Sequence, residues 1–105
     1  MIYAVIDTNV LVSALITHNP EAATAKVVRH LLERDFIPMY DEDIIAEYAD
    51  VLHRTKFPIL SETADALISH IIENGVEASR ITVGPRALYV HTKIGAETPL
   101  VAPYI

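Results

Sequence analysis

The feature that most constrains the fold is the opening stretch MIYAVIDTNVLVSALI, in which three polar residues interrupt an apolar run. Residues 2–6 form a short continuous apolar segment with β-branched side chains, which suits a strand covered on both faces. Asp7 or Thr8 can cap the helix that follows. The chain therefore begins as a strand, a tight turn and a helix. Asp7-Thr8-Asn9 is either a simple cap or one wall of a functional site.

The length and composition set the next bounds. With 105 residues, 51% of them hydrophobic, the chain fits one compact domain. It has no cysteine, which excludes a disulfide scaffold or thiolate metal site and favours a reducing, cytoplasmic setting. The opening apolar run is broken at Asp7 and has no basic leader, so it resembles neither a signal peptide nor a membrane span. We therefore expect a soluble cytoplasmic protein.

The charge limits the partners of the chain. The formal net charge is −6, and of the 14 acidic side chains only Glu97 follows residue 83. Affinity for phosphates comes mainly from Lys and Arg, so an acidic chain is a poor non-specific binder of nucleic acid. A nucleic-acid role would therefore need divalent metal ions to bridge carboxylate and phosphate.

Helices and short strands alternate after the opening. The segment His18-Asn19-Pro20-Glu21 combines a cap, a proline and an early acid, which predicts a helix start. Asp41 can cap a third helix that runs to about Arg54. Ser61 can cap a fourth, which stops at Asn74-Gly75 with a left-handed glycine. The apolar positions at helical spacing are Val10, Leu11, Ala14 and Leu15, then Val27, Val28, Leu31 and Leu32, then Ile44, Ile45, Tyr48, Val51 and Leu52, and finally Ala64, Leu67, Ile68, Ile71 and Ile72.

The strands complete the predicted architecture. Brief strands are predicted at residues 35–40 and 80–83, and the alternation with helices predicts an α/β domain. From Gly84 onward, glycines and prolines punctuate a stretch with no sustained periodicity. We therefore divide the single domain into an α/β core at residues 1–83 and a divergent C-terminal tail at residues 84–105.

Two acids are candidates for chemistry. Asp7 follows a buried strand, and ligand crevices in open α/β sheets form at the carboxyl ends of strands. Its simpler role is to cap the helix. Successive residues of a helix are rotated by about 100°, which places the apolar face of the third helix around Tyr48. Glu47 is the acid of this helix that lies nearest to that face. Its simpler role is that of a solvated surface glutamate, so neither acid is decisive alone.

The other polar clusters have structural explanations. Asp41-Glu42-Asp43 caps the third helix and compensates its dipole, and His53, Arg54 and Lys56 complement its C-terminus. Contact of these basic residues with RNA phosphates is the less favoured interpretation. The five histidines lack the i, i+4 pair of a zinc helix, and the chain has no Gly-rich phosphate loop.

Two segments resemble the PIN-domain ribonucleases. VIDTNVLVSAL, at residues 5–15, is similar to the opening of that family, and YDEDIIAEYADVLHRTKF, at residues 40–57, is similar to its second acidic block. VapC-like toxin components of prokaryotic toxin-antitoxin pairs look most similar. The resemblance covers residues 1–83 and implies a PIN-like three-layer fold with a short parallel sheet flanked by helices.

The resemblance implies an endoribonuclease that depends on Mg²⁺ or Mn²⁺ and hydrolyses RNA phosphodiester bonds by attack of water. Asp7 and Glu47 would match its metal-binding acids. Asn9 or Thr8 would match the polar partner that orients Asp7 or a water held by the metal. Hard divalent cations select carboxylate oxygens, lower the pKa of water and neutralise charge on the scissile phosphate. The implied partners are an RNA substrate, an antitoxin protein and a second copy of the chain.

The C-terminal part departs from the family pattern. Family members generally supply a third acid from an Asp-rich segment after the third strand, whereas this chain reads VGPRALYVHTKIGAETPLVAPYI with Glu97 as its sole acid. We favour the hypothesis that a frameshift or early stop replaced the native segment. Alternatively, Glu97 or a second subunit supplies the ligand. Two acids alone predict weak metal binding and slow or absent hydrolysis, since lost ligands each tend to cost at least about tenfold.

Other function classes remain open. A catalytically inactive PIN-like module, or a remnant of a truncated gene, would self-associate or dock an antitoxin-like partner through its helices. A phosphotransfer enzyme of the haloacid-dehalogenase type also begins with a strand and an aspartate, but it needs a second acid where this chain has Asn9. A receiver domain needs paired acids at the first strand and a late lysine, and neither is evident.

Overall fold

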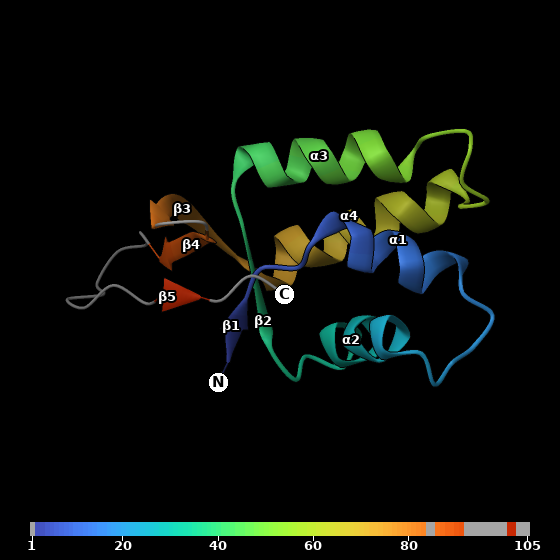
Figure 1. The fold of residues 1–105 in the computed structure, drawn as a ribbon, viewed down its shortest axis with the longest axis horizontal. Helices are drawn as coiled ribbons and strands as arrows, with labels where there is room; N and C mark the ends of the chain where they lie inside the picture. Colours follow the sequence, from blue (N-terminus) through green and yellow to red (C-terminus); the bar gives the residue numbers. More distant parts are fainter. Residues whose placement is uncertain (1, 84–85, 92–100, 103–105) are drawn as a thin grey trace.

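The computed structural model of the chain describes residues 2–83, 86–91 and 101–102. Within these residues, helices and strands follow the order β1-α1-α2-β2-α3-α4-β3-β4-β5 (Figure 1). None of the described helices is long and apolar enough to cross a membrane. The helices are α1 (Thr8–Ile16), α2 (Ala23–Leu32), α3 (Glu42–Leu52) and α4 (Ser61–Asn74). The strands are β1 (Tyr3–Ala4), β2 (Ile37–Tyr40), β3 (Val76–Val83), β4 (Arg86–His91) and β5 (Val101–Ala102).

The sheet has a parallel part and an antiparallel part, in the strand order β1-β2-β3-β4-β5. β1 pairs with β2 and β2 pairs with β3, both in parallel. β3 pairs with β4 and β4 with β5, both antiparallel. The predicted α/β class is confirmed, but β4 and β5 were not predicted from the sequence. Residues 86–91 read RALYVH, without a strict alternation of apolar and polar side chains, and backbone pairing with the long β3 strand defines β4 instead.

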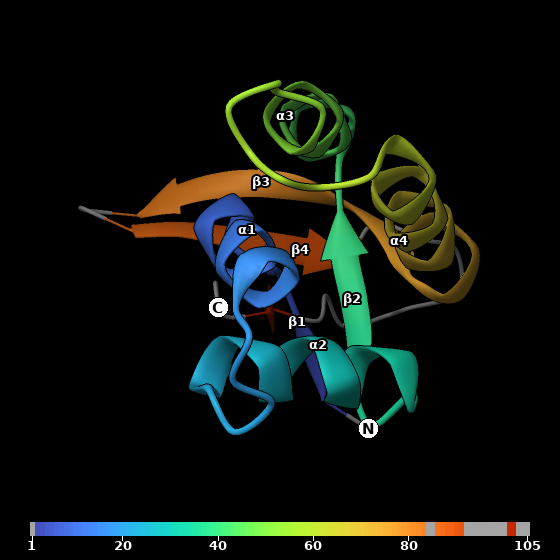
Figure 2. The same cartoon turned by 90° about the vertical axis from the view of Figure 1, so that its right-hand side faces the viewer.

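The four helices lie together beside the parallel strands. In Figure 1, all four extend to the right of β1 and β2. α2 packs against α1, and α3 packs against both α1 and α4 (Figure 2). The chain passes from β1 to β2 through α1 and α2, and from β2 to β3 through α3 and α4, because parallel neighbours need such a crossover. The α/β arrangement of four helices with a short parallel sheet is therefore as predicted.

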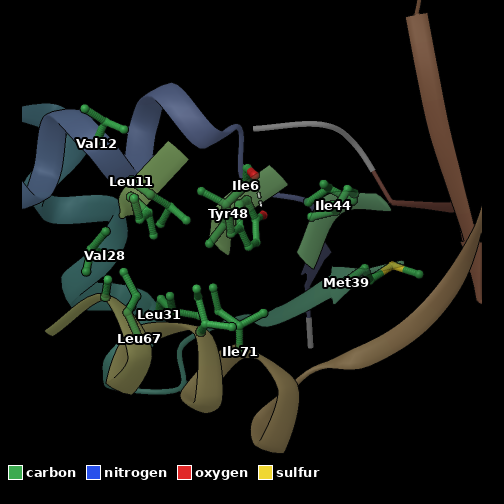
Figure 3. Close-up of a cluster of buried hydrophobic side chains, with 14 of the residues drawn as sticks. Ile6, Leu11, Val12, Val28, Leu31, Met39, Ile44, Tyr48, Leu67 and Ile71 are labelled. Atoms are coloured by element: carbon green, nitrogen blue, oxygen red, sulfur yellow. Dashed lines mark hydrogen bonds between the residues drawn. The ribbon is translucent and has the colours of Figure 1, made fainter. Parts of the chain in front are cut away.

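The core lies where the four helices meet the sheet. Leu11 of α1, Leu31 of α2, Tyr48 of α3 and Ile71 of α4 point into one interior, and each is at most 1% exposed (Figure 3). Burial of each such apolar side chain contributes about 1.5–3 kcal/mol to folding. The predicted apolar stripes thus form the core, with two exceptions. Leu32 is 52% exposed and Ile72 is 43% exposed, because both lie at the edges of their stripes.

Two of the predicted caps are confirmed. Asp7 caps α1, and Asp41 caps α3 through a 2.7 Å hydrogen bond that its Oδ1 accepts from the backbone N–H of Ile44. Such a bond satisfies one of the N–H groups that a helix start leaves unpaired. α3 ends at Leu52, slightly before the predicted end at Arg54.

The predicted starts of α2 and α4 were wrong. The side chain of Asn19 accepts the backbone N–H of Glu21 at 3.0 Å, and the Asn19 carbonyl accepts that of Ala22 at 3.1 Å. Asn19 thereby closes a turn, so α2 begins only at Ala23. Ser61 is the first residue of α4 rather than its cap, and no side-chain hydrogen bond caps this helix.

Gly75 ends α4 for a different reason from the one predicted. Its backbone is extended, with φ −101° and ψ −172°, so the left-handed terminus was wrong. A Cβ atom here would lie 2.3 Å from the Ile71 carbonyl oxygen and 2.5 Å from that of Pro38. Glycine is therefore required because α4 and β2 approach each other closely at this point.

Candidate functional site

Asp7 lies in the turn between β1 and α1. Its Oδ1 accepts a 2.8 Å hydrogen bond from the backbone N–H of Asn9, and its carbonyl accepts the N–H of Val10 at 3.0 Å. This cap fixes the carboxylate at the carboxyl end of β1, where ligand crevices form in α/β sheets. Among the interactions of the described residues, the second carboxylate oxygen of Asp7 has no partner.

Two hydrogen bonds attach α3 to this turn. The hydroxyl of Tyr48 donates to the carbonyl of Ile6 at 2.5 Å (Figure 3). One residue earlier, Glu47 accepts a hydrogen bond from the hydroxyl of Thr8 through Oε2. Tyr48 and Thr8 are 1% and 5% exposed, so both donors are buried, whereas Glu47 itself is exposed. Together they bring the Glu47 carboxylate next to the turn that carries Asp7.

The residues around these carboxylates form a pocket of about 320 Å³. α1 and the turn before it supply one part of the lining, and the second half of α3 with the loop after it supplies the rest. The lining residues are Asp7, Thr8, Asn9, Glu47, Val51, Arg54, Lys56 and Phe57. All four residues predicted for the site therefore line one pocket.

The charges in the pocket are mixed. Asp7 and Glu47 contribute two carboxylates, and Arg54 and Lys56 contribute two cations. Arg54 pairs with Asp50, one turn earlier on α3, at 3.0 Å. Among the ion pairs of the described residues, none joins either cation to Asp7 or Glu47. The two cations therefore do not neutralise the carboxylates directly.

Thr8 and Asn9 each contact a different one of the two carboxylates. The resemblance implied that one of them orients Asp7 or a water. Thr8 holds Glu47, and Asn9 contacts Asp7 through its backbone N–H. Phe57 was not predicted as a site residue. Its sequence signal is the segment RTKF, in which two basic residues follow the end of α3 and precede an aromatic residue.

The oxygen donors fit a hard divalent cation. Mg²⁺ is usually held by one or two carboxylates together with waters, and Asp7 and Glu47 supply such a pair in a polar pocket. The cap leaves one oxygen of Asp7 for this purpose. Glu97, the acid considered as a substitute ligand, lies outside the described residues.

A second group with metal-ligating atoms lies elsewhere. His30, Glu33 and Asp35 are exposed at the end of α2, with one ligand atom from each within 4.8 Å of the others. Nδ1 of His30 lies 2.7 Å from Oδ2 of Asp35, so the two already pair with each other. This group contains neither Asp7 nor Glu47 and is separate from the pocket.

His53 joins the end of α3 to α4. Its Nδ1 lies 2.6 Å from the Ala49 carbonyl oxygen and its Nε2 lies 2.7 Å from Oδ1 of Asp65. The hydrogen bond to Ala49 raises the pKa of His53 most, and the hydrogen bond to Asp65 raises it further. These two contacts link the end of α3 to α4 next to the loop that begins with Arg54.

These features define an α/β domain with two carboxylates at the carboxyl end of its first strand. The sequence matches the family model of the PIN domain over residues 3–93. The chain therefore belongs to the PIN domain family, which indicates a nuclease-like function, a general dependence on divalent metal and a general capacity to bind RNA. Comparison with curated proteins and with solved structures gives no match.

Proposed function

We propose that this protein is an endoribonuclease dependent on Mg²⁺ or Mn²⁺, with Asp7 and Glu47 as its metal-binding residues. The observation that carries the proposal is the shared pocket, which both carboxylates line although they come from β1–α1 and from α3. The contact between Thr8 and Glu47 spans 39 positions of the chain, so local sequence does not account for it. Membership of the PIN family supports the same function.

The roles of the residues follow from their contacts. A bound divalent ion would supply a lowered pKa for water and charge neutralisation at the scissile phosphate. The Asn9 backbone N–H holds one oxygen of Asp7 and leaves the other for the ion. The Thr8 hydroxyl holds Oε2 of Glu47 and fixes the direction of that carboxylate. With only two acids supplied by the described residues, we expect weak metal binding and slow hydrolysis.

We further propose that the protein is the toxin component of a toxin-antitoxin pair. The similarity of residues 5–15 and 40–57 to VapC-like sequences supports this role. Its partners would be an RNA substrate, an antitoxin protein and a second copy of the chain. Asp7 and Glu47, the two acids that we propose as metal ligands, lie in the same two segments.

A second candidate function is a binding module without catalysis, and one observation favours it. On another side of α3 lies a largely apolar groove of about 400 Å³, lined by Tyr40, Asp41, Glu42, Ile45, Ala46, Ala49, Ile72 and Glu77. Burial raises the pKa of Tyr40, and the charge of Glu77 raises it further. The acidic rim suits a segment of an antitoxin with apolar side chains and basic residues.

Cleavage of labelled single-stranded RNA with Mn²⁺ or Mg²⁺ tests the catalytic proposal. We expect metal-dependent cleavage that Asp7→Asn and Glu47→Gln abolish. The matched controls are Asp43→Asn and Glu73→Gln, which alter exposed acids outside the pocket and should leave the rate unchanged. Equal loss in the controls would contradict the site. Failure of the wild-type chain to cleave, with antitoxin binding that Ala49→Glu weakens, would favour the binding module.

A further inference from the structure

We propose that Arg54, Lys56 and Phe57 form a binding wall for single-stranded RNA, with the two cations on backbone phosphates and the Phe57 ring stacked on a base. The proposal rests on the proposed function, because it gives the substrate of that pocket its position. We call these three residues the RNA wall. They lie close together in the loop that follows α3.

The location of the RNA wall supports this role. All three residues line the same pocket as Asp7 and Glu47. The chain has a net charge of −6, and a pocket with carboxylates alone would repel a polyanion. Neither cation forms an ion pair with the two pocket carboxylates among the described residues, so both are available to a phosphate without breaking the proposed metal site.

The present contacts of the cations are weak ones that a phosphate can replace. The Arg54 side chain is 47% exposed and its partner Asp50 is 70% exposed, and ion pairs of such exposure contribute little. Nζ of Lys56 lies 5.1 Å from the centroid of the Phe57 ring. A cation–π contact at an exposed site is likewise weak, so Lys56 can leave the ring for a phosphate when a base stacks there.

Phe57 determines the kind of nucleic acid. Its ring packs partly against the core, which fixes its place at the pocket. Aromatic side chains stack on bases that are already unpaired, whereas bases in a duplex are stacked on each other. An aromatic residue beside two cations is therefore typical of single-strand recognition.

The test measures binding without cleavage. A labelled, unstructured oligouridylate of about ten nucleotides, within the usual site size for single strands, is titrated with protein in EDTA, and fluorescence anisotropy is followed at several salt concentrations. The double variant Arg54→Gln, Lys56→Gln should bind at least about tenfold more weakly, with its salt slope reduced by about 1.4, since each phosphate contact contributes about 0.7 for single strands.

Phe57→Leu should lower affinity by about fivefold or more without changing the salt slope, because stacking is not a charge contact. Phe57→Tyr keeps the aromatic ring and should restore binding, and thermal melting of both variants separates loss of stacking from loss of folding. Lys26→Gln is the control for loss of a single cation elsewhere, since Lys26 lies on α2, outside the pocket, and pairs with Glu21. It should bind RNA like the wild type.

Two results would overturn the proposal. One is wild-type affinity in the double variant, and the other is binding of an RNA duplex of equal length as tightly as the single strand. The outcome is independent of the nuclease assay. Loss of binding in the double variant supports the RNA wall even if Asp7→Asn leaves cleavage unchanged, whereas loss of cleavage in Asp7→Asn with normal binding in the double variant supports the nuclease alone.

Discussion

The two hollows beside α3 show how one helix serves two different surfaces. The pocket takes Glu47 and Val51 from it, with Arg54 from the loop that follows, and is rich in charged and polar groups. The groove takes Ile45, Ala46 and Ala49, and is mostly apolar. Between them, the buried face of the helix holds Ile44, Tyr48 and Leu52 in the core. The charged pocket is therefore suited to ions and phosphate, and the apolar groove is suited to a protein partner.

The largest predicted effect is on the rate of RNA cleavage, which should depend on the pocket and not on the groove. We predict that Asp7→Asn or Glu47→Gln lowers the rate of RNA cleavage by at least about a hundredfold, since loss of a metal ligand costs at least as much as loss of the groups that orient it. Ala49→Glu, in the groove, should leave the rate unchanged. Single-turnover kinetics with a labelled RNA measures both. A groove variant that cleaves RNA as slowly as the pocket variants would contradict the distinction between the two surfaces.

The second prediction compares how much two tyrosine hydroxyls contribute to stability: that of Tyr48 on the core side of α3 and that of Tyr40 in the groove. Tyr48→Phe should lower the free energy of unfolding by about 1–3 kcal/mol, because it leaves the buried Ile6 carbonyl without its hydroxyl donor. Tyr40→Phe should cost less, since the Tyr40 hydroxyl donates to the Ile72 carbonyl at a long 3.4 Å in a half-buried position. Urea denaturation of the two variants measures the difference. An equal loss in both would contradict the special role of Tyr48.

A third prediction concerns Thr8. Thr8→Val keeps the shape of the buried side chain and removes its hydrogen bond to Glu47. We expect about a tenfold weakening of Mn²⁺ binding, the lower end of the cost of losing a group that orients a ligand. Thr8→Ser retains the hydroxyl and should restore the affinity. Weakening in the serine variant to the level of the valine variant would assign the loss to packing.

The smallest effect is the pH dependence of His53. Its pKa is raised in the folded state, chiefly by the hydrogen bond to Ala49, so its stabilising contribution is complete below the unfolded pKa of about 6.5. That contribution is lost as the pH rises through the folded pKa. Unfolding free energy measured against pH should fall over this range. His53→Gln should flatten this part of the curve, and an unchanged curve would contradict the raised pKa.

Local signals in the sequence predicted the elements that form the site. Asp7 and Asp41 were recognisable as caps because a cap depends on only the next few residues. The helical wheel of the third predicted helix placed Glu47 as the acid nearest the core; Glu47 is exposed, and its carboxylate contacts the buried Thr8. The catalytic and metal-binding roles of these residues stay predictions.

The parts that the sequence did not predict depend on contacts between distant residues. The bond between Tyr48 and Ile6 spans 42 positions, and no local pattern encodes it. Gly75 is required by its approach to Pro38 of β2 rather than by its own backbone angles. Phe57 lies in a loop, where periodicity gives no information, and it reaches the pocket only because α3 packs beside α1.

Calorimetric titration with Mn²⁺ tests most directly whether Asp7 and Glu47 share one ion. The wild-type chain and Asp43→Asn should bind Mn²⁺ with the same affinity, while Asp7→Asn and Glu47→Gln should each show no measurable binding. Binding that stays unchanged in both pocket variants would contradict the proposed metal site.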